Sequence, residues 1–249
     1  MGKTAIITGA GSGLGQATAV RLAEEGVNIA VVDVSEKGAN ETVDLVKKAG
    51  ADAVFIQADV SKEAEVKNYV DKTLEHFGSI DYFFNNAGIS GSGKYFLESD
   101  VSEIERIVGI NLLGALYGIR YVADVMVKNG GGSIVNTSSS AGVIGQDSVV
   151  TYAATKHAIV GMTKSLVAEY AKDGLRVNAI APGPTETKMV AEFYAANPQM
   201  KENATGGIPQ KRLGTPEEVA ELVAFLLTSK AQYINGEVVR IDGGFTSTK

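Results

Sequence analysis

Short runs of apolar, mostly β-branched or aromatic residues recur along the chain. They occupy residues 5–7, 29–32, 53–56, 80–84, 133–136, 177–180 and 238–241. Several are apolar without alternation, which is typical of parallel strands covered on both faces. Between them, apolar residues recur at helical spacing, as at Val66, Tyr69, Val70 and Leu74. Strands that alternate with helices predict an α/β fold, namely a doubly wound parallel sheet with helices on both faces.

Two longer helices are predicted in the second half of the chain. One covers 101–128 and stops at a run of glycines, and the other covers 151–172 and stops at Asp173-Gly174. No low-complexity linker divides the sequence, so residues 1–249 are expected to form one domain. The region 182–215 differs, because it holds four of the five prolines together with an amphipathic piece. So long a connection predicts a substrate lid at about 184–215.

Composition narrows the classes of function. The chain has no cysteine and two histidines, so disulfides and thiolate metal sites are excluded and no metal centre is expected. The net charge of −6 comes without a basic cluster, which argues against nucleic acid as a partner. The N-terminus lacks the apolar core of a signal peptide, and no uncharged stretch reaches the roughly 18 residues of a membrane span. A cytoplasmic protein without a membrane partner is therefore expected.

A glycine-rich turn, Thr8-Gly9-Ala10-Gly11-Ser12-Gly13-Leu14-Gly15, follows the first predicted strand and opens the first helix. A helix N-terminus offers unpaired N–H groups and partial positive charge to a pyrophosphate. Asp33 ends the second strand, where a carboxylate can bind both hydroxyls of an adenosine ribose and repel a 2′-phosphate. Taken singly, the turn also fits a tight strand–helix connection and Asp33 a helix cap. Together they predict NAD(H) as the cofactor.

A second group of polar residues points to proton transfer. Tyr152 and Lys156 are spaced i, i+4 on a predicted helix, so their side chains share one face. A nearby ammonium favours the phenolate and lowers the pKa of the phenol toward the working range of a general acid or base. Ser139 lies at the end of a predicted strand, where it can donate a hydrogen bond to a substrate oxygen. Ser138 and Ser140 fit turn and cap hydroxyls.

With these motifs in place, the chain resembles the short-chain dehydrogenase/reductase family over essentially its full length. The matching motifs are Thr8-Gly9-x-x-x-Gly13-x-Gly15, Asp59-Val60, Asn85-Asn86-Ala87-Gly88, Asn111, Ser139, Tyr152-x-x-x-Lys156 and Pro182-Gly183-x-x-x-Thr187. The resemblance implies a Rossmann fold with strand order 3-2-1-4-5-6-7, a nicotinamide cofactor and a homotetramer. It also implies that Tyr152 is the catalytic acid/base, that Lys156 binds ribose, and that Asn111 holds a water in a proton relay.

The resemblance carries the cofactor and catalytic sites onto named positions. The expected catalytic residues are Asn111, Ser139, Tyr152 and Lys156. The expected cofactor residues are Gly9, Ser12, Gly13, Leu14, Gly15, Asp33, Asp59, Val60, Asn86, Ala87, Gly88, Tyr152, Lys156, Pro182, Gly183, Thr185 and Thr187. Neighbouring apolar residues predict a substrate pocket formed by Ala141, Val143, Ile144, Val149, Met189, Phe193 and Tyr194.

These residues predict an enzyme that transfers hydride reversibly between NAD(H) and a small-molecule secondary alcohol or ketone. A 3-oxoacyl-[acyl-carrier-protein] reductase is an alternative, although that branch commonly has a basic residue at the turn position of Ser12 and arginines where Gly130 and Asp173 stand. A sugar dehydrogenase is another. A non-catalytic dinucleotide sensor is a third, and such proteins usually lack one of the four catalytic side chains that this chain keeps.

Overall fold

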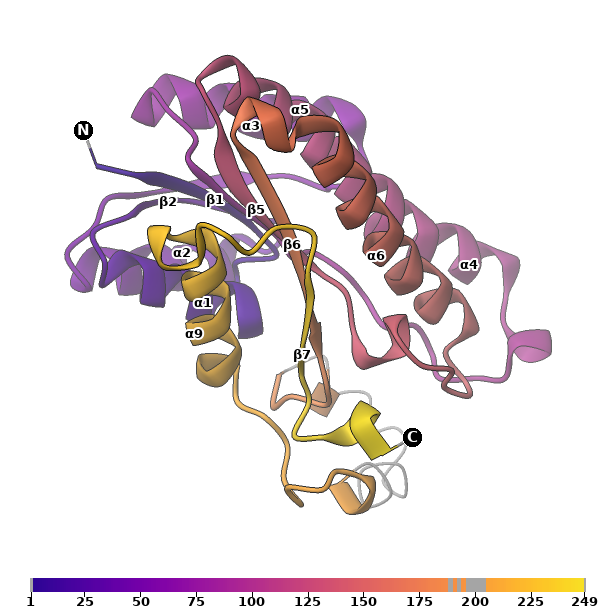
Figure 1. Ribbon diagram of the computed structural model, residues 1–249. Helices are drawn as coiled ribbons and strands as arrows, with labels where there is room; N and C mark the ends of the chain where they lie inside the picture. The colour runs from indigo at the N-terminus through magenta and orange to yellow at the C-terminus, as the bar shows by residue number, and fades with distance from the viewer. Residues whose placement is uncertain (1, 188–189, 192–193, 196–204, 249) are drawn as a thin grey trace.

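A seven-stranded parallel sheet crosses the computed structural model, which describes residues 2–187, 190–191, 194–195 and 205–248 (Figure 1). The strands are β1 (Thr4–Thr8), β2 (Asn28–Asp33), β3 (Ala53–Gln57), β4 (Tyr82–Asn85), β5 (Gly132–Thr137), β6 (Leu175–Pro182) and β7 (Val238–Ile241). Their order is β3-β2-β1-β4-β5-β6-β7, and every neighbouring pair is parallel. The predicted strand order is confirmed.

Helices cover both faces of this sheet, as predicted. On one face lie α1 (Gly13–Ala23), α2 (Glu36–Lys48) and α9 (Pro216–Leu227). On the other lie α3 (Glu63–Phe77), α5 (Gly114–Lys128) and α6 (Val150–Tyr170). All five residues of β1 are buried, as are the four middle residues of β2. Burial on both faces explains why these strands read as continuous apolar runs.

The helix predicted over 101–128 is interrupted. It consists of α4 (Val101–Val108), a π-helical turn at Gly109–Leu113, and α5. Asn111 lies in the π turn, is 1% exposed, and bonds to the backbone of Ile89 instead of facing solvent. A π turn inserts an extra residue into the helix and often marks a functional site. By length and hydropathy this 28-residue stretch could cross a membrane, but in the described part of the chain its apolar residues Ile119, Val122 and Met126 are buried against the sheet.

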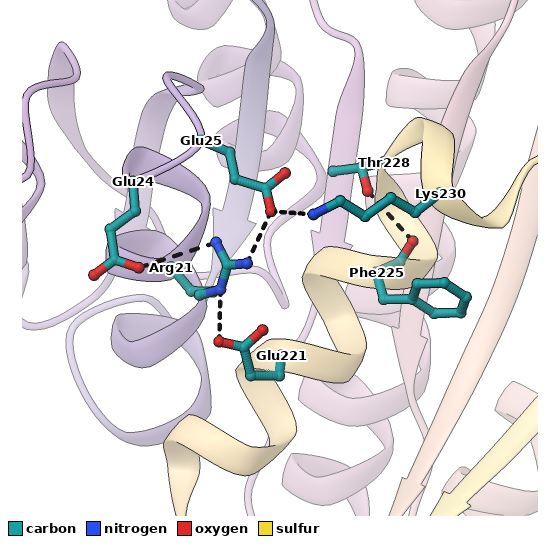
Figure 2. Close-up of polar contacts among 7 residues, drawn as sticks. All are labelled: Arg21, Glu24, Glu25, Glu221, Phe225, Thr228 and Lys230. Carbon is teal, nitrogen blue, oxygen red and sulfur yellow. Dashed lines mark hydrogen bonds and ion pairs between the residues drawn. The ribbon is translucent and has the colours of Figure 1, made fainter.

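An ion-pair network joins α1 to α9 and to the turn that follows it (Figure 2). Arg21 donates from Nη2 to Glu25 at 2.8 Å and from Nε to Glu221 at 2.7 Å. Lys230 Nζ lies 2.6 Å from the same Glu25 carboxylate. The Arg21–Glu221 and Lys230–Glu25 contacts join residues about 200 positions apart in sequence, so the network fastens the C-terminal helix to the first one.

The segment that carries the predicted lid has its two ends paired. Thr185 and Gly214 form an isolated parallel bridge. Glu186 N donates to Gly214 O at 2.9 Å, and Gly214 N donates to Pro184 O at 3.1 Å. Just beyond the bridge, Arg212 makes a double ion-paired contact to Glu218, whose carboxylate also caps α9 through Thr215 N. The two ends of the segment are therefore held together.

Candidate active site

A cavity of about 440 Å³ opens at the carboxyl ends of the strands. Its walls come from the segments that follow β1, β2, β3, β4, β5 and β6, together with α6. The chain reverses its direction of strand addition between β1 and β4, and a doubly wound sheet binds ligands in the crevice at such a switch point. This cavity is therefore the candidate site.

The glycine turn forms one end of the cavity. Gly9, Ser12, Gly13 and Leu14 line it, whereas Gly15 lies behind the turn. A Cβ on Gly15 would lie 2.2 Å from Gly9 O, so only glycine allows α1 to start so close to β1. Ser12 caps α1 without a side-chain hydrogen bond. The first N–H groups of α1 thus lack a side-chain cap and suit an anion, which fits the pyrophosphate of a dinucleotide.

Asp33 lies beside this turn, at the end of β2. Its Oδ2 accepts from Gly11 N and its Oδ1 from Ser35 N, both at 2.8 Å. Asp33 lines the cavity with Val32, Val34, Ala58, Asp59 and Val60. Among the described lining residues, Lys156 is the only cationic side chain, and it belongs to the other end of the cavity. This end therefore offers a carboxylate to ribose hydroxyls and no counter-charge to a 2′-phosphate.

The middle of the cavity is built by the end of β4. Asn86 Nδ2 donates to Thr8 O at 3.0 Å, and Thr8 Oγ1 accepts from the backbone of Asn86 and Ala87. These bonds fix β4 to β1 where both strands end. Asn86, Ala87 and Gly88 consequently line the cavity.

Two side chains from α6 enter the site one helical turn apart. Lys156 is 4% exposed, and its Nζ donates to Thr137 O at 2.7 Å. The same Nζ lies 5.6 Å from the centroid of the Tyr152 ring. Ser138 Oγ donates to Lys156 O at 2.9 Å, which pins this part of α6 against the end of β5. Ser139, Tyr152 and Lys156 all line the cavity, so the structure brings the three predicted residues together.

Burial governs the ionisation of these groups. It lowers the pKa of Lys156 to about 8, because an ammonium loses hydration in the protein interior. Burial also raises the pKa of Tyr152, and the side chain of Ser139 acts in the opposite direction. The sequence predicts that Lys156 lowers the phenol pKa. In this structure desolvation of the phenolate is the larger effect, so the direction is upward.

Asn111 does not line the cavity, unlike the other three expected catalytic residues, Ser139, Tyr152 and Lys156. Its Oδ1 accepts from Ile89 N at 2.9 Å, and its Nδ2 donates to Ile89 O at 2.8 Å and to Thr155 Oγ1 at 3.4 Å. It lies just behind the cavity wall, because a Cβ on Gly88 would be 3.3 Å from Asn111 Oδ1 and 3.5 Å from Lys156 Nζ. The side chain therefore holds the loop after β4. Its place in a proton relay stays a prediction.

The remaining walls enclose the space for a substrate. Pro182, Gly183, Thr185 and Thr187 line the cavity, and Thr187 Cγ2 would lie 3.2 Å from a Cβ on Gly13, so the start of the predicted lid reaches the glycine turn. Ala141, Val149, Val190 and Tyr194 also line it. Val143 and Ile144 do not, because the chain turns back at this point and both amides donate to Ser140 O. Met189 and Phe193 lie outside the described residues.

Several lining residues were missed by the sequence reasoning, notably Ile89, Ser90 and Gln146. The local signal that could have identified Gln146 is its polar side chain in the stretch between Ser139 and Tyr152. Among the described residues, no group of three histidine, aspartate or glutamate side chains is placed to hold a metal ion.

A doubly wound sheet with a glycine turn at its switch point is the architecture of dinucleotide-dependent oxidoreductases. Residues 9–246 match the family model described as enoyl-(acyl carrier protein) reductase. Levodione reductase from Leifsonia aquatica is 43% identical over 97% of this chain and 93% of its own. Cyclohexanol dehydrogenase from Acinetobacter sp. (strain SE19) is 38% identical over 98% and 95%. The crystal structure of levodione reductase superposes with a TM-score of 0.95, at 42% identity over 99% of this chain and 98% of the other.

The chain belongs to the short-chain dehydrogenase/reductase family of oxidoreductases.

Proposed function

We propose that this protein catalyses the reversible oxidation of a secondary alcohol on a small, mainly apolar ring compound to the ketone, with NAD(H). One observation carries the proposal: Ser139, Tyr152 and Lys156 line the same cavity as Asp33. The cavity therefore joins a proton-transfer group to a ribose-binding carboxylate. The bound nicotinamide supplies the hydride in reduction and accepts it in oxidation.

In the reductive direction, the phenol of Tyr152 gives its proton to the substrate oxygen as negative charge develops there, so that the carbonyl becomes an alcohol. Ser139 donates a hydrogen bond to the same oxygen and stabilises its developing charge. Lys156, while protonated, stabilises the phenolate that Tyr152 leaves behind and binds the nicotinamide ribose. In the oxidative direction the phenolate takes the hydroxyl proton back. A raised phenol pKa suits the reductive role at neutral pH, because the proton is then present.

The choice of NAD over NADP rests on Asp33. A 2′-phosphate about 4 Å from its carboxylate would be repelled by about 4 kcal/mol at an effective dielectric of about 20. About a third of that value already corresponds to a tenfold preference. Gly38 supports the same choice, since a Cβ there would lie 2.4 Å from Gly11 O. The first turn of α2 thus packs closely against the glycine turn and leaves little room for a larger group.

The proposal that the substrate is a ring compound rests on the residues that line the substrate end of the cavity. Ile89, Ala141, Val149, Pro184 and Val190 give that end an apolar lining. Such a lining stabilises a ligand mainly by removing apolar surface from water. Cyclohexanol dehydrogenase, which the chain resembles over nearly its whole length, is named for a cyclic secondary alcohol. An alcohol of this kind fits both observations.

We extend the proposal to the rest of the molecule. Residues 1–249 form one domain in the cytoplasm, and about 184–215 act as a lid over the substrate. The chain assembles as a homotetramer through faces that include the exposed apolar side chains Leu113, Leu116 and Val150. Light scattering after size exclusion tests the assembly, and a mass of about 26.0 kDa for the native particle would contradict it.

A second candidate, reduction of an acyl-carrier-protein substrate, is favoured by the description of the matching family model. Acetoacetyl and enoyl thioesters would test it. Activity on either thioester that exceeds activity on every cyclic ketone would favour this candidate.

The main test mixes purified protein with NAD or NADP and a panel of secondary alcohols at alkaline pH. We expect NADH absorbance to appear with cyclic alcohols, and not with the Tyr152→Phe variant. No reduction of either nucleotide by any alcohol, in a protein that still binds NADH, would contradict the proposal and favour a dinucleotide sensor.

A further inference from the structure

Gln146 carries a carboxamide at the substrate end of the cavity, where Ile89, Ala141 and Val149 are apolar and Ser139, Ser140 and Tyr152 carry hydroxyl groups. It lies in the loop between the turn at Ser140–Gly142 and α6, six residues before Tyr152. Its Nε2 donates to Ser140 Oγ at 3.0 Å. Gln146, Ser140 and Tyr152 all line the cavity, so Gln146 borders the same cavity as the expected catalytic phenol.

The carboxamide keeps unused hydrogen-bonding capacity. A glutamine side chain has two N–H donors and an acceptor oxygen. One donor goes to Ser140, and among the hydrogen bonds of the described residues Gln146 Oε1 accepts none. Gln146 is partly exposed, so this acceptor can exchange water for a ligand, and polar groups in such pockets usually fix the orientation of a ligand. The free acceptor and the second donor therefore suit a polar atom of the substrate.

The loop holds Gln146 in a defined position. Ser140 is 5% exposed, and its carbonyl accepts from the backbone of Val143 and Ile144. On the other side of Gln146, Ser148 has a positive φ of 61°, a conformation that serine seldom adopts. Such conformations persist where the surrounding structure enforces them, and they cluster at ligand sites. The hydroxyl that fixes Gln146 is thus itself held in place, which reduces the entropy lost when a ligand binds.

We propose that Gln146 is a specificity-determining residue that binds a second oxygen of the substrate, away from the reacting carbon. The physiological substrate is then a hydroxyketone, a diketone or the corresponding diol, rather than a simple cyclic ketone. Oε1 accepts from a hydroxyl, and the free Nε2–H donates to a carbonyl. This inference rests on the proposed function of the same cavity.

The experiment compares matched ketones in the reductive direction with NADH. 3- and 4-hydroxycyclohexanone are paired with 3- and 4-methylcyclohexanone, in which a methyl group of similar size replaces the hydroxyl. In the unmodified protein, kcat/KM should favour at least one hydroxyketone over its methyl partner by roughly tenfold, as one net hydrogen bond provides. In Gln146→Leu this ratio should fall to about 1, whereas Gln146→Glu, which keeps an acceptor, should retain it.

The matched control is Gln232→Leu, an exposed glutamine outside the cavity, which should leave the ratio unchanged. The inference is overturned if the unmodified protein reduces the ketones without preferring any hydroxyketone. It is also overturned if Gln146→Leu slows both members of each pair equally, because Gln146 then only braces the loop. Failure of the unmodified protein to reduce any of the ketones would instead overturn the proposed function.

Discussion

Two regions of this molecule differ in what surrounds their basic side chains. Between α1 and α9, Arg21 and Lys230 meet the carboxylate of Glu25 near the surface. There the pKa of Arg21 is raised by the hydrogen bond to Glu221, and the pKa of Glu25 is lowered by Lys230. In the cavity, Lys156 is buried and takes part in no ion pair of the described residues. Burial brings its pKa down to about 8.

The difference lies in what replaces water around the charge. A carboxylate partner fixes the charged state across the physiological pH range, which is useful for joining elements. A backbone carbonyl in the interior compensates only part of the lost hydration, so the charge becomes sensitive to pH and to a neighbouring ligand. Substitutions in the two regions should therefore separate catalysis from stability.

The largest effect is expected at Tyr152. Replacing it with phenylalanine removes the proton-transfer group while keeping the ring, so kcat should fall by about 10²- to 10⁴-fold. NADH affinity, measured by fluorescence titration, should change little. Tyr170→Phe, on the exposed end of the same helix, is the control and should keep full activity. A Tyr152→Phe enzyme with most of its activity would refute the acid/base assignment.

Lys156→Ala should damage two steps at once. Loss of a hydrogen bond from a charged group costs about 1.5–3 kcal/mol, so kcat and NADH affinity should each fall by roughly 10- to 100-fold. Steady-state kinetics with a separate NADH titration would measure both. Lys164→Ala, two turns further along α6 and exposed, is the matched control. Unchanged cofactor affinity would remove the ribose-binding role.

The two directions of the reaction should respond oppositely to pH. Burial raises the pKa of Tyr152, so the phenol keeps its proton near neutrality and reduction is favoured there. Oxidation needs the phenolate, and its kcat/KM should rise with pH by up to about tenfold per unit. The rise should flatten above a pH of about 8, where Lys156 loses its proton. An oxidation profile that falls through this range would contradict these assignments.

Asp33→Ser should reduce the NAD preference by about tenfold without creating a strong NADP enzyme. The carboxylate is removed, but the close packing of Gly38 on Gly11 remains and no cation is supplied. The ratio of kcat/KM with NAD to that with NADP is the measurement. Asp44→Ser, on the exposed face of α2, serves as the control. An unchanged ratio would show that Asp33 does not read the ribose.

The smallest effect is expected in the surface network. Arg21→Met should lower the free energy of unfolding by about 1 kcal/mol, because exposed pairs are screened by water and salt. Activity should be unchanged. The lowered pKa of Glu25 means that the contribution is complete above the usual glutamate range and is lost as pH falls through the lowered value. Denaturant melts at several pH values and salt concentrations measure this, and a large loss of activity would contradict the separation.

Local patterns were sufficient for most of the fold. Apolar runs and helical periodicity each concern neighbouring residues, and the resemblance to a family supplied the strand order. The π turn was not predictable, because Asn111 adopts it while bonding to Ile89, a contact across 22 positions. Likewise β4 begins at Tyr82 rather than at Ile80 because pairing with β1 sets its start.

The candidate site, too, could be predicted only in part from the sequence. The motifs located Asp33, Ser139, Tyr152 and Lys156, because each ends a strand or lies on one helical face. Gln146 was missed, and Val143 and Ile144 were assigned to the cavity, because a single turn at Ser140 decides which side chains line it. The pKa of Tyr152 depends on how deeply the phenol is buried, and no sequence pattern reports that depth.

The bridge between Thr185 and Gly214 has a consequence for how new substrates are acquired. Since both ends of the intervening segment are paired with each other, its length can change beyond Thr187 without separating those ends or moving Thr187 from the glycine turn. Doubling such a segment adds only about 0.6 kcal/mol of closure entropy. Exchanging the part of this segment that follows Thr187 between relatives should therefore transfer substrate range, while the nucleotide preference stays with the host.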